Sequence, residues 1–245
     1  TFTVNVVVGE CHDGYLKDAQ GRHVRREHVY QALEEARSGP VVQGAVGAGT
    51  GMSCFEFKGG VGTSSRCTPD ESGAFTVGAQ VVSNFGSRER LMIRGVPVGL
   101  ALPKSDSSTP PLADGGSVMI VLATDAPLTS RQLTRIARRA AAGLARTGST
   151  HSQSSGDFAI AFSTTNRHPH DGKSVLRTQK MVAERSHVMN YLFKAVVEAT
   201  EEAVIDSLLQ ARTMVGRDGR IREALPIGPL VELMRRHGWP EVGRE

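Results

Sequence analysis

A serine that directly follows two glycines is the residue of this 245-residue chain with the clearest chemical potential. Gly115-Gly116-Ser117 stands where a polar stretch over residues 104–116 meets a continuous apolar run over residues 117–124. Glycine adopts backbone angles that other residues avoid. The Ser117 hydroxyl could therefore attack the preceding carbonyl and convert the Gly116–Ser117 amide into an ester. Hydrolysis of that ester would leave Ser117 as a new N-terminus.

A free N-terminal serine carries its own base. The α-amine has an ordinary pKa of about 7.7–8.0, so part of it is neutral at physiological pH. It can take the hydroxyl proton directly or through a water molecule, and no histidine is then required. The alternative is that Gly-Gly-Ser is only the end of a flexible linker, and these three residues taken alone favour that alternative.

Other clusters of reactive side chains point less clearly to chemistry. Cys11, His12 and Asp13 are adjacent in sequence, and adjacent residues rarely all face one metal ion. The stretch 168–171, with two histidines and an aspartate, is more typical of a polar loop. The glycine-rich tract 44–51 lacks the Gly-Lys-Ser/Thr ending of a phosphate-binding loop. We therefore expect neither a metal nor an organic cofactor.

Several short blocks carry a more specific signal when they are taken together and in order. They are Asp13-Gly-Tyr15-Leu, Gly21-Arg-His-Val24, Gly47-Ala-Gly-Thr-Gly-Met52, Phe57-Lys-Gly-Gly-Val-Gly-Thr-Ser-Ser-Arg66, Phe75-Thr-Val-Gly78, Asn84-Phe-Gly86, the run from Ser117 to Leu128, Ser155-Gly-Asp157 and Ala161-Phe-Ser-Thr164. In combination they resemble the P1 family of self-processing aminopeptidases, which includes the L-aminopeptidase/D-amidase/D-esterase and β-aminopeptidase groups.

The resemblance implies a precursor that cuts itself at Gly116–Ser117 into an α and a β chain. Residues 1–116 would form the C-terminal part of the α chain, ending in the linker 104–116, and residues 117–245 the β chain. The two would make one domain, with the upstream third of the precursor absent. The family fold is α+β, a four-layer αββα sandwich resembling N-terminal nucleophile hydrolases with different connectivity. Members typically assemble as tetramers of αβ units.

The resemblance also implies roles for five residues. Ser117 would be the nucleophile, and Ser155 would hydrogen-bond the nucleophile and its amine. Asp157 would orient this network and hold the α-ammonium, at a position where other members often have Glu. Asn84 would help stabilise the oxyanion, and Tyr15 would contact the substrate near the oxyanion or the amine. Each residue also has a plainer interpretation, such as a turn entering a strand at Ser155 or a half-buried aromatic at Tyr15.

The elements that must position these residues follow from local patterns. Alternating or continuous apolar runs predict strands, and apolar residues at helical spacing predict helices. Thr129 and Gln132 have the spacing of a capping box, and arginines are expected to line the solvated or subunit-facing side of that helix. The predicted strands are 1–8, 75–82, 91–98, 117–124 and 157–163, and the predicted helices are 27–37, 129–146 and 184–212.

Composition limits the partners. The net charge is +4, without the mixture of aromatic and basic residues that marks a single-strand nucleic-acid binder, and no apolar run is long enough to span a membrane. Three cysteines without a CxxC spacing favour a reducing compartment. We expect a cytoplasmic enzyme acting on a small peptide or an amino-acid amide or ester, with a periplasmic location left open.

Two rival functions stay open at this point. An ornithine-acetyltransferase-like acyltransferase would share the fold and the self-cleavage, but its nucleophile is typically Thr within an Ala-Thr motif. A catalytically silent assembly protein could keep the same fold. The joint presence of the five candidate residues argues against a silent protein.

Overall fold

The computed structural model describes residues 6–103, 116–169, 172 and 174–240. Its centre is a four-stranded sheet in the order β3-β4-β5-β6, in which β5 pairs antiparallel with β4 and parallel with β6. The strands are β3 (Val61–Cys67), β4 (Thr76–Asn84), β5 (Gly116–Thr124) and β6 (Ser155–Ser163). β5 is hydrogen-bonded on both sides, as its continuous apolar sequence predicts.

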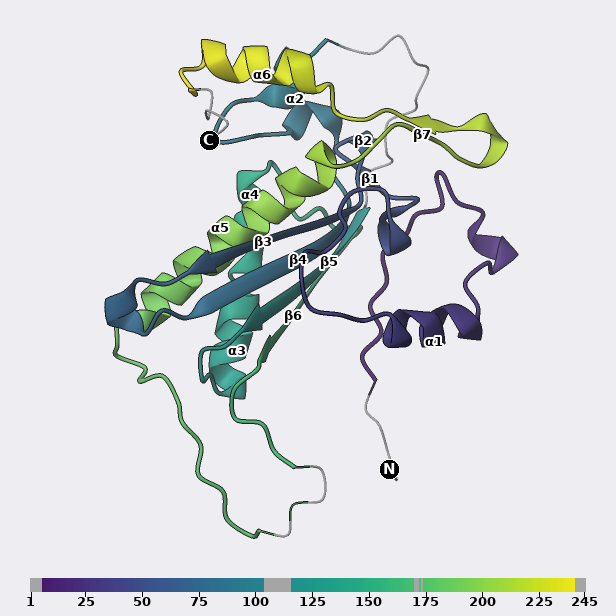
Figure 1. Cartoon of the computed structure of the whole chain (residues 1–245). Coiled ribbons are helices and arrows are strands. Elements are labelled where there is room, and N and C mark those ends of the chain that lie inside the picture. The colour runs from purple at the N-terminus through teal and green to yellow at the C-terminus, as the bar shows by residue number, and fades with distance from the viewer. Residues whose placement is uncertain (1–5, 104–115, 170–171, 173, 241–245) are drawn as a thin grey trace.

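Helices cover one face of this sheet (Figure 1). α5 packs across β3 and β4, α3 packs on β6, and α4 packs against α5. The helices are α1 (Arg26–Glu34), α2 (Val98–Ala101), α3 (Ser130–Ala137), α4 (Ala140–Arg146), α5 (Val188–Leu209) and α6 (Ile227–Arg236). Gly62 lets α5 approach closely, because a Cβ there would lie 1.8 Å from the carbonyl oxygen of Ala203.

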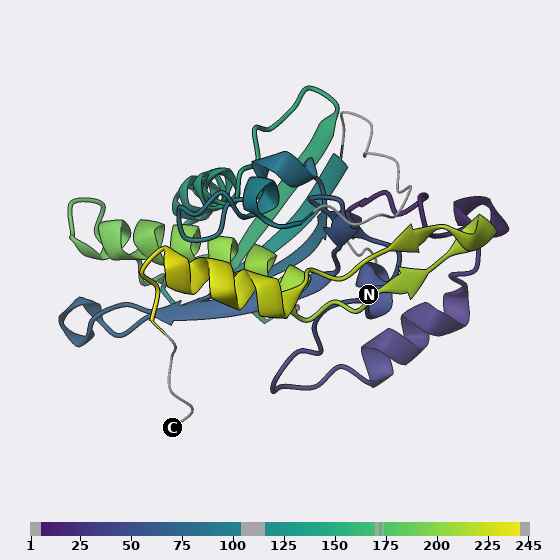
Figure 2. The same cartoon turned by 90° about the horizontal axis from the view of Figure 1, so that it is seen from above.

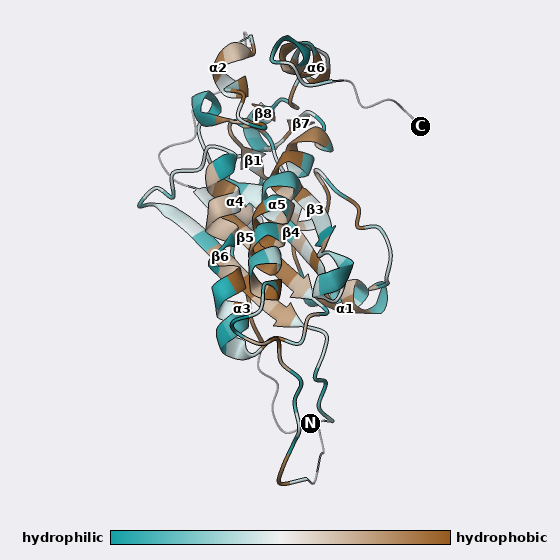
Figure 3. Cartoon of the chain, turned by 90° about the vertical axis from the view of Figure 1, so that its left-hand side faces the viewer, coloured by the Kyte–Doolittle hydropathy of each residue, from teal (hydrophilic) through white to brown (hydrophobic). Residues whose placement is uncertain are grey.

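The hydrophobic core lies between the sheet and the layer of α3, α4 and α5, and brown, apolar stretches are visible on these elements in Figure 3. Alternate residues of β4 and β5 point into it, among them the fully buried Val81 and Leu122. We call this side of the sheet the helix face. The opposite side, the open face, carries Phe158 and Phe162 of β6, which are 53% and 46% exposed. The described residues thus form one α layer and one β layer.

The N-terminal segment crosses the open face beside β5. Gly9 lies against the side chain of Met119, and the Cys11 thiol donates a hydrogen bond to the carbonyl oxygen of Val82 at 3.6 Å. The segment then leads to α1, which lies away from the helical layer (Figure 2). This course brings residues 11 and 12 next to the start of β5.

Short elements complete the structure. Two small antiparallel pairs flank the large sheet, and five single-turn 3₁₀ helices connect the other elements of the described chain. The pairs are β1 (Ser53–Cys54) with β2 (Phe57–Lys58), and β7 (Met214–Val215) with β8 (Ile221–Arg222). The 3₁₀ helices are Ala19–Gly21, Gly47–Gly49, Asp70–Ser72, Arg88–Arg90 and Arg217–Gly219.

Three of the predicted elements are wrong in kind or extent. Residues 6–8 form no strand, and the rest of the predicted strand 1–8 lies outside the described residues, as does the connection 104–115. The predicted strand 91–98 is a tight turn, in which Ile93 pairs with Val96 and Arg94 has φ +52°. The predicted helix 129–146 is divided into α3 and α4 by a turn at Arg138 and Arg139, although the backbone angles of both residues stay in the right-handed helical region.

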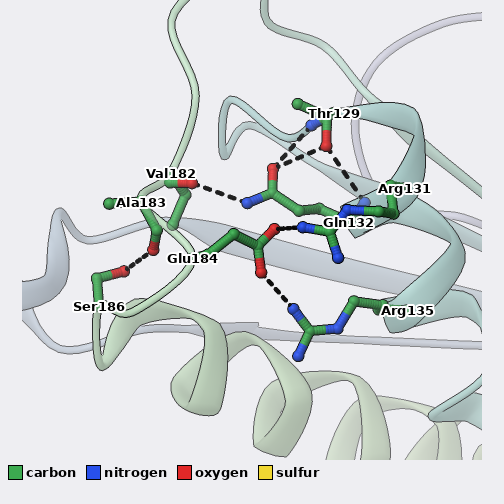
Figure 4. Close-up of polar contacts among 8 residues, drawn as sticks. All are labelled: Thr129, Arg131, Gln132, Arg135, Val182, Ala183, Glu184 and Ser186. Carbon is green, nitrogen blue, oxygen red and sulfur yellow. Dashed lines mark hydrogen bonds and ion pairs between the residues drawn. The ribbon is translucent and has the colours of Figure 1, made fainter.

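Two arginines of α3 bind a returning chain segment while their side chains stay exposed to solvent, as predicted (Figure 4). Thr129 and Gln132 form the predicted capping box, and the Gln132 side chain also donates to the carbonyl oxygen of Val182 at 2.7 Å. Arg131 and Arg135 both pair with Glu184. These contacts hold the segment that leads into α5 against the start of α3.

The α+β class is confirmed by this mixture of one sheet and a separate helical layer. α6 and the hairpin of β7 and β8 form in a tail that the sequence patterns left without assigned elements, although the turn at residues 216–219 was predicted. No helix among the described residues has the length and apolarity needed to cross a membrane.

Candidate active site

Ser117 lies at the start of β5, between two strands. Its neighbours across the sheet are Asn84 at the end of β4 and Gly156 at the start of β6. Side chains of directly paired residues leave a sheet on the same face, so Ser117 and Asn84 both project from the open face. Ser117 is 7% exposed. The structure therefore brings the candidate nucleophile and the candidate oxyanion group together.

Two glycines make room around Ser117. A Cβ at Gly116 would lie 2.7 Å from the Cα of Phe85, so only glycine fits at the residue before the nucleophile. A Cβ at Gly156 would lie 3.8 Å from the Cβ of Ser117 and 3.1 Å from the ring of Phe158. Glycine at 156 thus leaves open the space directly beside the serine side chain.

The Ser117 hydroxyl has two partners from the N-terminal segment. The backbone N–H of His12 donates to Oγ at 2.9 Å, and Oγ donates to the Cys11 sulfur at 3.2 Å. Burial raises the pKa of the Cys11 thiol to about 11, so this sulfur is a neutral thiol at physiological pH. Among the described residues, no imidazole or carboxylate forms a hydrogen bond with Oγ. A side-chain base for Ser117 is therefore lacking in the described part of the chain.

The Asn84 side chain is held by two backbone groups. Its Oδ1 accepts a hydrogen bond from the N–H of Ser53 at 2.9 Å, and its Nδ2 donates to the carbonyl oxygen of His12 at 2.6 Å. An N–H needs an acceptor and a carbonyl needs a donor, so these partners fix which way the amide points. The second Nδ2 hydrogen is not used by any described residue and is available to a ligand.

Ser155 and Asp157 project from the helix face. They pair across the sheet with Gly116 and Val118, not with Ser117. The Ser155 hydroxyl donates to Asp157 Oδ1 at 2.7 Å, and His151 Nδ1 lies 2.5 Å from Asp157 Oδ2. The described residues contain no hydrogen bond from either side chain to Ser117. Ser155 nevertheless lies beside the Gly116–Ser117 peptide, whose nitrogen would become the α-amine.

Tyr15 belongs to the same N-terminal segment as His12 but lies further from β5. The Arg222 guanidinium stacks on its ring at 3.9 Å, and Arg220 donates to its carbonyl oxygen at 3.4 Å. Arg222 also donates to the hydroxyl of Ser53 at 3.1 Å. Tyr15 is thus connected to Ser117 only through this chain of contacts, and no contact joins the two directly in the described part of the chain.

The described residues contain no group of three or more His, Cys, Asp and Glu side chains that could hold a metal ion. Cys11 and His12 contact the candidate nucleophile, and Asp13 pairs with Lys17 at 3.7 Å. In the second cluster, His168 contacts Gln179 at 2.9 Å, while residues 170 and 171 lie outside the described residues. All three cysteines of the chain are free thiols.

A model of peptidase family S58 matches residues 1–222, which is most of the chain. The chain belongs to peptidase family S58. This confirms the resemblance to the aminopeptidase family that the sequence blocks indicate.

Named relatives agree with this assignment. The chain is 40% identical to the β-peptidyl aminopeptidase BapA of Sphingosinicella microcystinivorans over 244 residues, which cover 94% of this chain and 61% of the relative. It is 42% identical to the BapA of Sphingosinicella xenopeptidilytica over 240 residues, covering 94% of this chain and 59% of that protein.

Solved structures extend the comparison to the fold. The PH0078 protein of Pyrococcus horikoshii OT3 matches with a TM-score of 0.88 and 53% identity, over 98% of this chain and 65% of that one. The L-aminopeptidase D-Ala-esterase/amidase of Ochrobactrum anthropi, described as a new variant among the Ntn hydrolase fold, matches with a TM-score of 0.82 and 38% identity over 93% of this chain and 61% of its own. The predicted resemblance to N-terminal nucleophile hydrolases is thus confirmed. The chain spans less than two thirds of the length of these relatives.

Sequence reasoning within the S58 pattern missed three contributors to the site: the Cys11 thiol, which it considered only as a metal ligand, the His12 backbone and His151. His12 acts through its backbone N–H, and no side-chain pattern reveals a backbone contact. His151 precedes the Ser155-Gly-Asp157 block by only four residues, so its proximity to Asp157 was a usable signal. Its Nε2 also lies 3.2 Å from the carbonyl oxygen of Ala141.

Proposed function

We propose that the full-length protein is a self-processing serine aminopeptidase or amidase. It cuts its own Gly116–Ser117 bond and then uses Ser117 as an N-terminal nucleophile to release N-terminal amino acids from peptides, amides or esters. Residues up to 116 become the end of the α chain, and residues 117–245 become the β chain.

The observation that carries this proposal is the environment of Ser117 in a chain of family S58. The serine stands between Asn84 and Gly156, and its Oγ is held by a backbone N–H and a neutral thiol. An enzyme serine needs a base. With no imidazole or carboxylate bonded to Oγ among the described residues, the α-amine that cleavage would create supplies one.

Self-cleavage follows from the same groups. Ser117 Oγ attacks the Gly116 carbonyl carbon, the C–N bond breaks, and an ester to Oγ forms while the nitrogen of residue 117 takes up the proton. Water then hydrolyses the ester, leaving a carboxylate on Gly116 and a free α-amine on Ser117. The close packing of Gly116 against β4 holds this peptide in place for the attack.

Turnover repeats the chemistry on a substrate. The α-amine takes the Oγ proton as Oγ attacks the acyl carbon, and Asn84 donates its second Nδ2 hydrogen to the oxyanion. An amide donor aimed at the developing charge lowers the barrier by about 3–4 kcal/mol. The leaving amine receives the proton, an acyl-enzyme ester remains, and water releases the amino acid.

Ser155 and Asp157 serve the amine in this proposal. Ser155 lies beside the nitrogen of residue 117, from the helix face, and Asp157 holds the Ser155 hydroxyl. Asp157 thereby keeps the α-ammonium oriented. Tyr15 contributes to the substrate-binding side through the loop that it shares with His12.

The assembly is proposed from the family resemblance, and the comparisons bear on the rival functions. A tetramer of αβ units is the proposed assembly, by analogy with the family. The acyltransferase has less support, because the relatives reported above whose names state an activity are aminopeptidases or amidases. No specific observation favours the silent assembly protein.

A hydrolysis assay tests the proposal. The full-length protein and its Ser117→Ala variant are compared on L-alanyl, D-alanyl and β-alanyl p-nitroanilides. We expect p-nitroaniline release from at least one substrate with the wild type and none above background with the variant. Hydrolysis by an uncut Ser117→Ala protein would overturn the mechanism.

A further inference from the structure

A fully buried lysine lies behind the candidate oxyanion group. Lys58 in β2 has no exposed surface, and no carboxylate hydrogen-bonds to it among the described residues. Its Nζ donates instead to three backbone carbonyl oxygens, those of Gly49 at 2.9 Å, Met52 at 2.7 Å and Gly59 at 2.8 Å. An ammonium has three hydrogens, so its donors and acceptors match one to one. A charged side chain is almost never fully buried unless it is paired with an opposite charge. The burial of Lys58 among carbonyl groups alone therefore needs an explanation.

The Lys58 contacts lead directly to Asn84. The carbonyl oxygen of Met52 and the N–H of Ser53 belong to one peptide unit, and that N–H donates to Asn84 Oδ1. The Asn84 amide in turn donates to the carbonyl oxygen of His12. A single peptide therefore separates the buried ammonium from the side chain that faces the candidate nucleophile.

Hydrogen bonds in such a chain strengthen one another. A charged donor on the Met52 oxygen withdraws electron density from the peptide, which makes the Ser53 N–H a stronger donor. A stronger bond to Asn84 Oδ1 withdraws density from that amide as well, so its Nδ2 hydrogens become better donors. The interior has a low dielectric, which increases the effect.

We propose that Lys58 is a positioning residue that fixes and polarises the Met52–Ser53 peptide, so that Asn84 presents a stronger donor to the oxyanion. This inference rests on the proposed function, in which Asn84 stabilises the tetrahedral intermediate. Lys58 does not touch the substrate and acts only through Asn84.

The protonation state of Lys58 makes the relay measurable. Burial lowers the pKa of Lys58 to about 8, so the ammonium is charged at neutral pH and loses one donor hydrogen above pH 8. The titratable groups that act on Lys58 are Cys54 and Asp13, while Arg222 and, after cleavage, the α-amine of Ser117 lie at the other end of the relay, beside Ser53 and Asn84. Burial raises the pKa of Cys54 to about 12, Asp13 pairs with Lys17, and Arg222 donates to the Ser53 hydroxyl.

A double-mutant cycle tests the coupling to Asn84. The processed full-length enzyme is compared with Lys58→Met, Asn84→Ala and the double variant, and with Lys194→Met on the exposed side of α5 as the matched control. We expect Lys58→Met to lower kcat about 10-fold with KM changed by less than about 3-fold, because the lost interaction belongs to the transition state. In the Asn84→Ala background the same change should lower kcat by less than about 2-fold. If the losses of kcat in the two single variants instead multiply in the double variant, the proposal is wrong.

A second measurement does not depend on turnover. The ¹⁵N–¹H resonances of the Ser53 amide and the Asn84 side-chain amide are followed from pH 6.5 to 9.5 in the wild type and in Ser117→Ala, whose uncut chain has no α-amine at residue 117. In both proteins the two resonances should shift with one midpoint near pH 8, whereas a shift confined to the wild type would report the α-amine and overturn the relay. Static resonances would overturn the relay even if the enzyme is active, whereas a wild type that titrates but hydrolyses nothing would leave the relay standing and refute the proposed function.

Discussion

The two faces of the sheet hold the candidate site in different ways. On the open face, the side chains of Ser117 and Asn84 are buried and are held by backbone groups of His12 and Ser53. On the helix face, Asp157 is held by the side chains of Ser155 and His151. The Asp157 and His151 side chains are 21% and 36% exposed.

This difference has an energetic consequence. On the open face, backbone groups that the fold itself fixes hold the side chains in one position. On the helix face, an ion pair between partly exposed side chains stabilises its geometry by at most about 1 kcal/mol. Substitutions on the open face should therefore affect catalysis more than substitutions on the helix face. The four predictions that follow are ordered from the largest expected effect to the smallest.

Asn84→Ala should lower kcat by about 10²- to 10³-fold, because it removes a donor aimed at the oxyanion. The rate is measured per processed enzyme, with the processed fraction taken from the intact mass. Asn190→Ala, on the exposed side of α5, is the matched control and should leave kcat unchanged. A kcat within 3-fold of the wild type in Asn84→Ala would exclude the oxyanion role.

Lys58 should make the protein more stable as pH rises. Its folded-state pKa of about 8 lies below its ordinary value of 10.5 because of burial. Between these values the unfolded chain binds the proton and the folded chain does not, so the free energy of unfolding increases with pH. Urea unfolding should show a gain of about 2 kcal/mol from pH 7.5 to 9.5 that Lys58→Met lacks.

An identical pH dependence in the wild type and Lys58→Met would mean that Lys58 keeps its ordinary pKa. The two curves are compared as slopes, because Lys58→Met also leaves three carbonyl groups without their donor. The slope of the free energy of unfolding against pH is independent of the constant stability lost with these three hydrogen bonds.

Asp157→Asn should lower kcat by about 10-fold while the urea midpoint stays within error of the wild type. The neutral amide still accepts a hydrogen bond from Ser155 but no longer attracts the α-ammonium. Wild-type turnover in this variant would remove Asp157 from the site and leave the open face as the whole of the catalytic arrangement.

His151 should matter least. His151→Gln keeps one N–H that can reach Asp157, so its kcat should stay within about 2-fold of the wild type, whereas His151→Ala should lose about 5-fold. His168→Ala, in an exposed loop, is the control. An equal loss in His151→Gln and His151→Ala would show that the charge, not the hydrogen bond, holds Asp157.

The sequence predicted correctly the strand that carries the candidate nucleophile, but it predicted less well the geometry of the residues around that strand. The run 117–124 is apolar throughout, and this indicates a strand buried within a sheet. The predicted strand 91–98 failed because Arg94 and Gly95 both take positive φ and turn the chain back on itself. Hydrophobicity alone does not report such a turn.

The faces of the sheet were beyond prediction for a different reason. Alternation places Ser155 and Asp157 on one face, but only the register of β6 against β5 shows that this face is not that of Ser117. The parallel register depends on long-range packing. Lys58 was missed because lysine is normally exposed, so its burial among carbonyl groups cannot be deduced from its type or neighbours.

The most direct test of the account is the intact mass of the full-length protein under denaturing conditions, measured beside Ser117→Ala. We predict two fragments in the wild type, one of them beginning at Ser117, and a single uncut chain in the variant. A single uncut chain in the wild type, or cleavage in the variant, would contradict the claim that Ser117 is a nucleophile released by its own attack on Gly116.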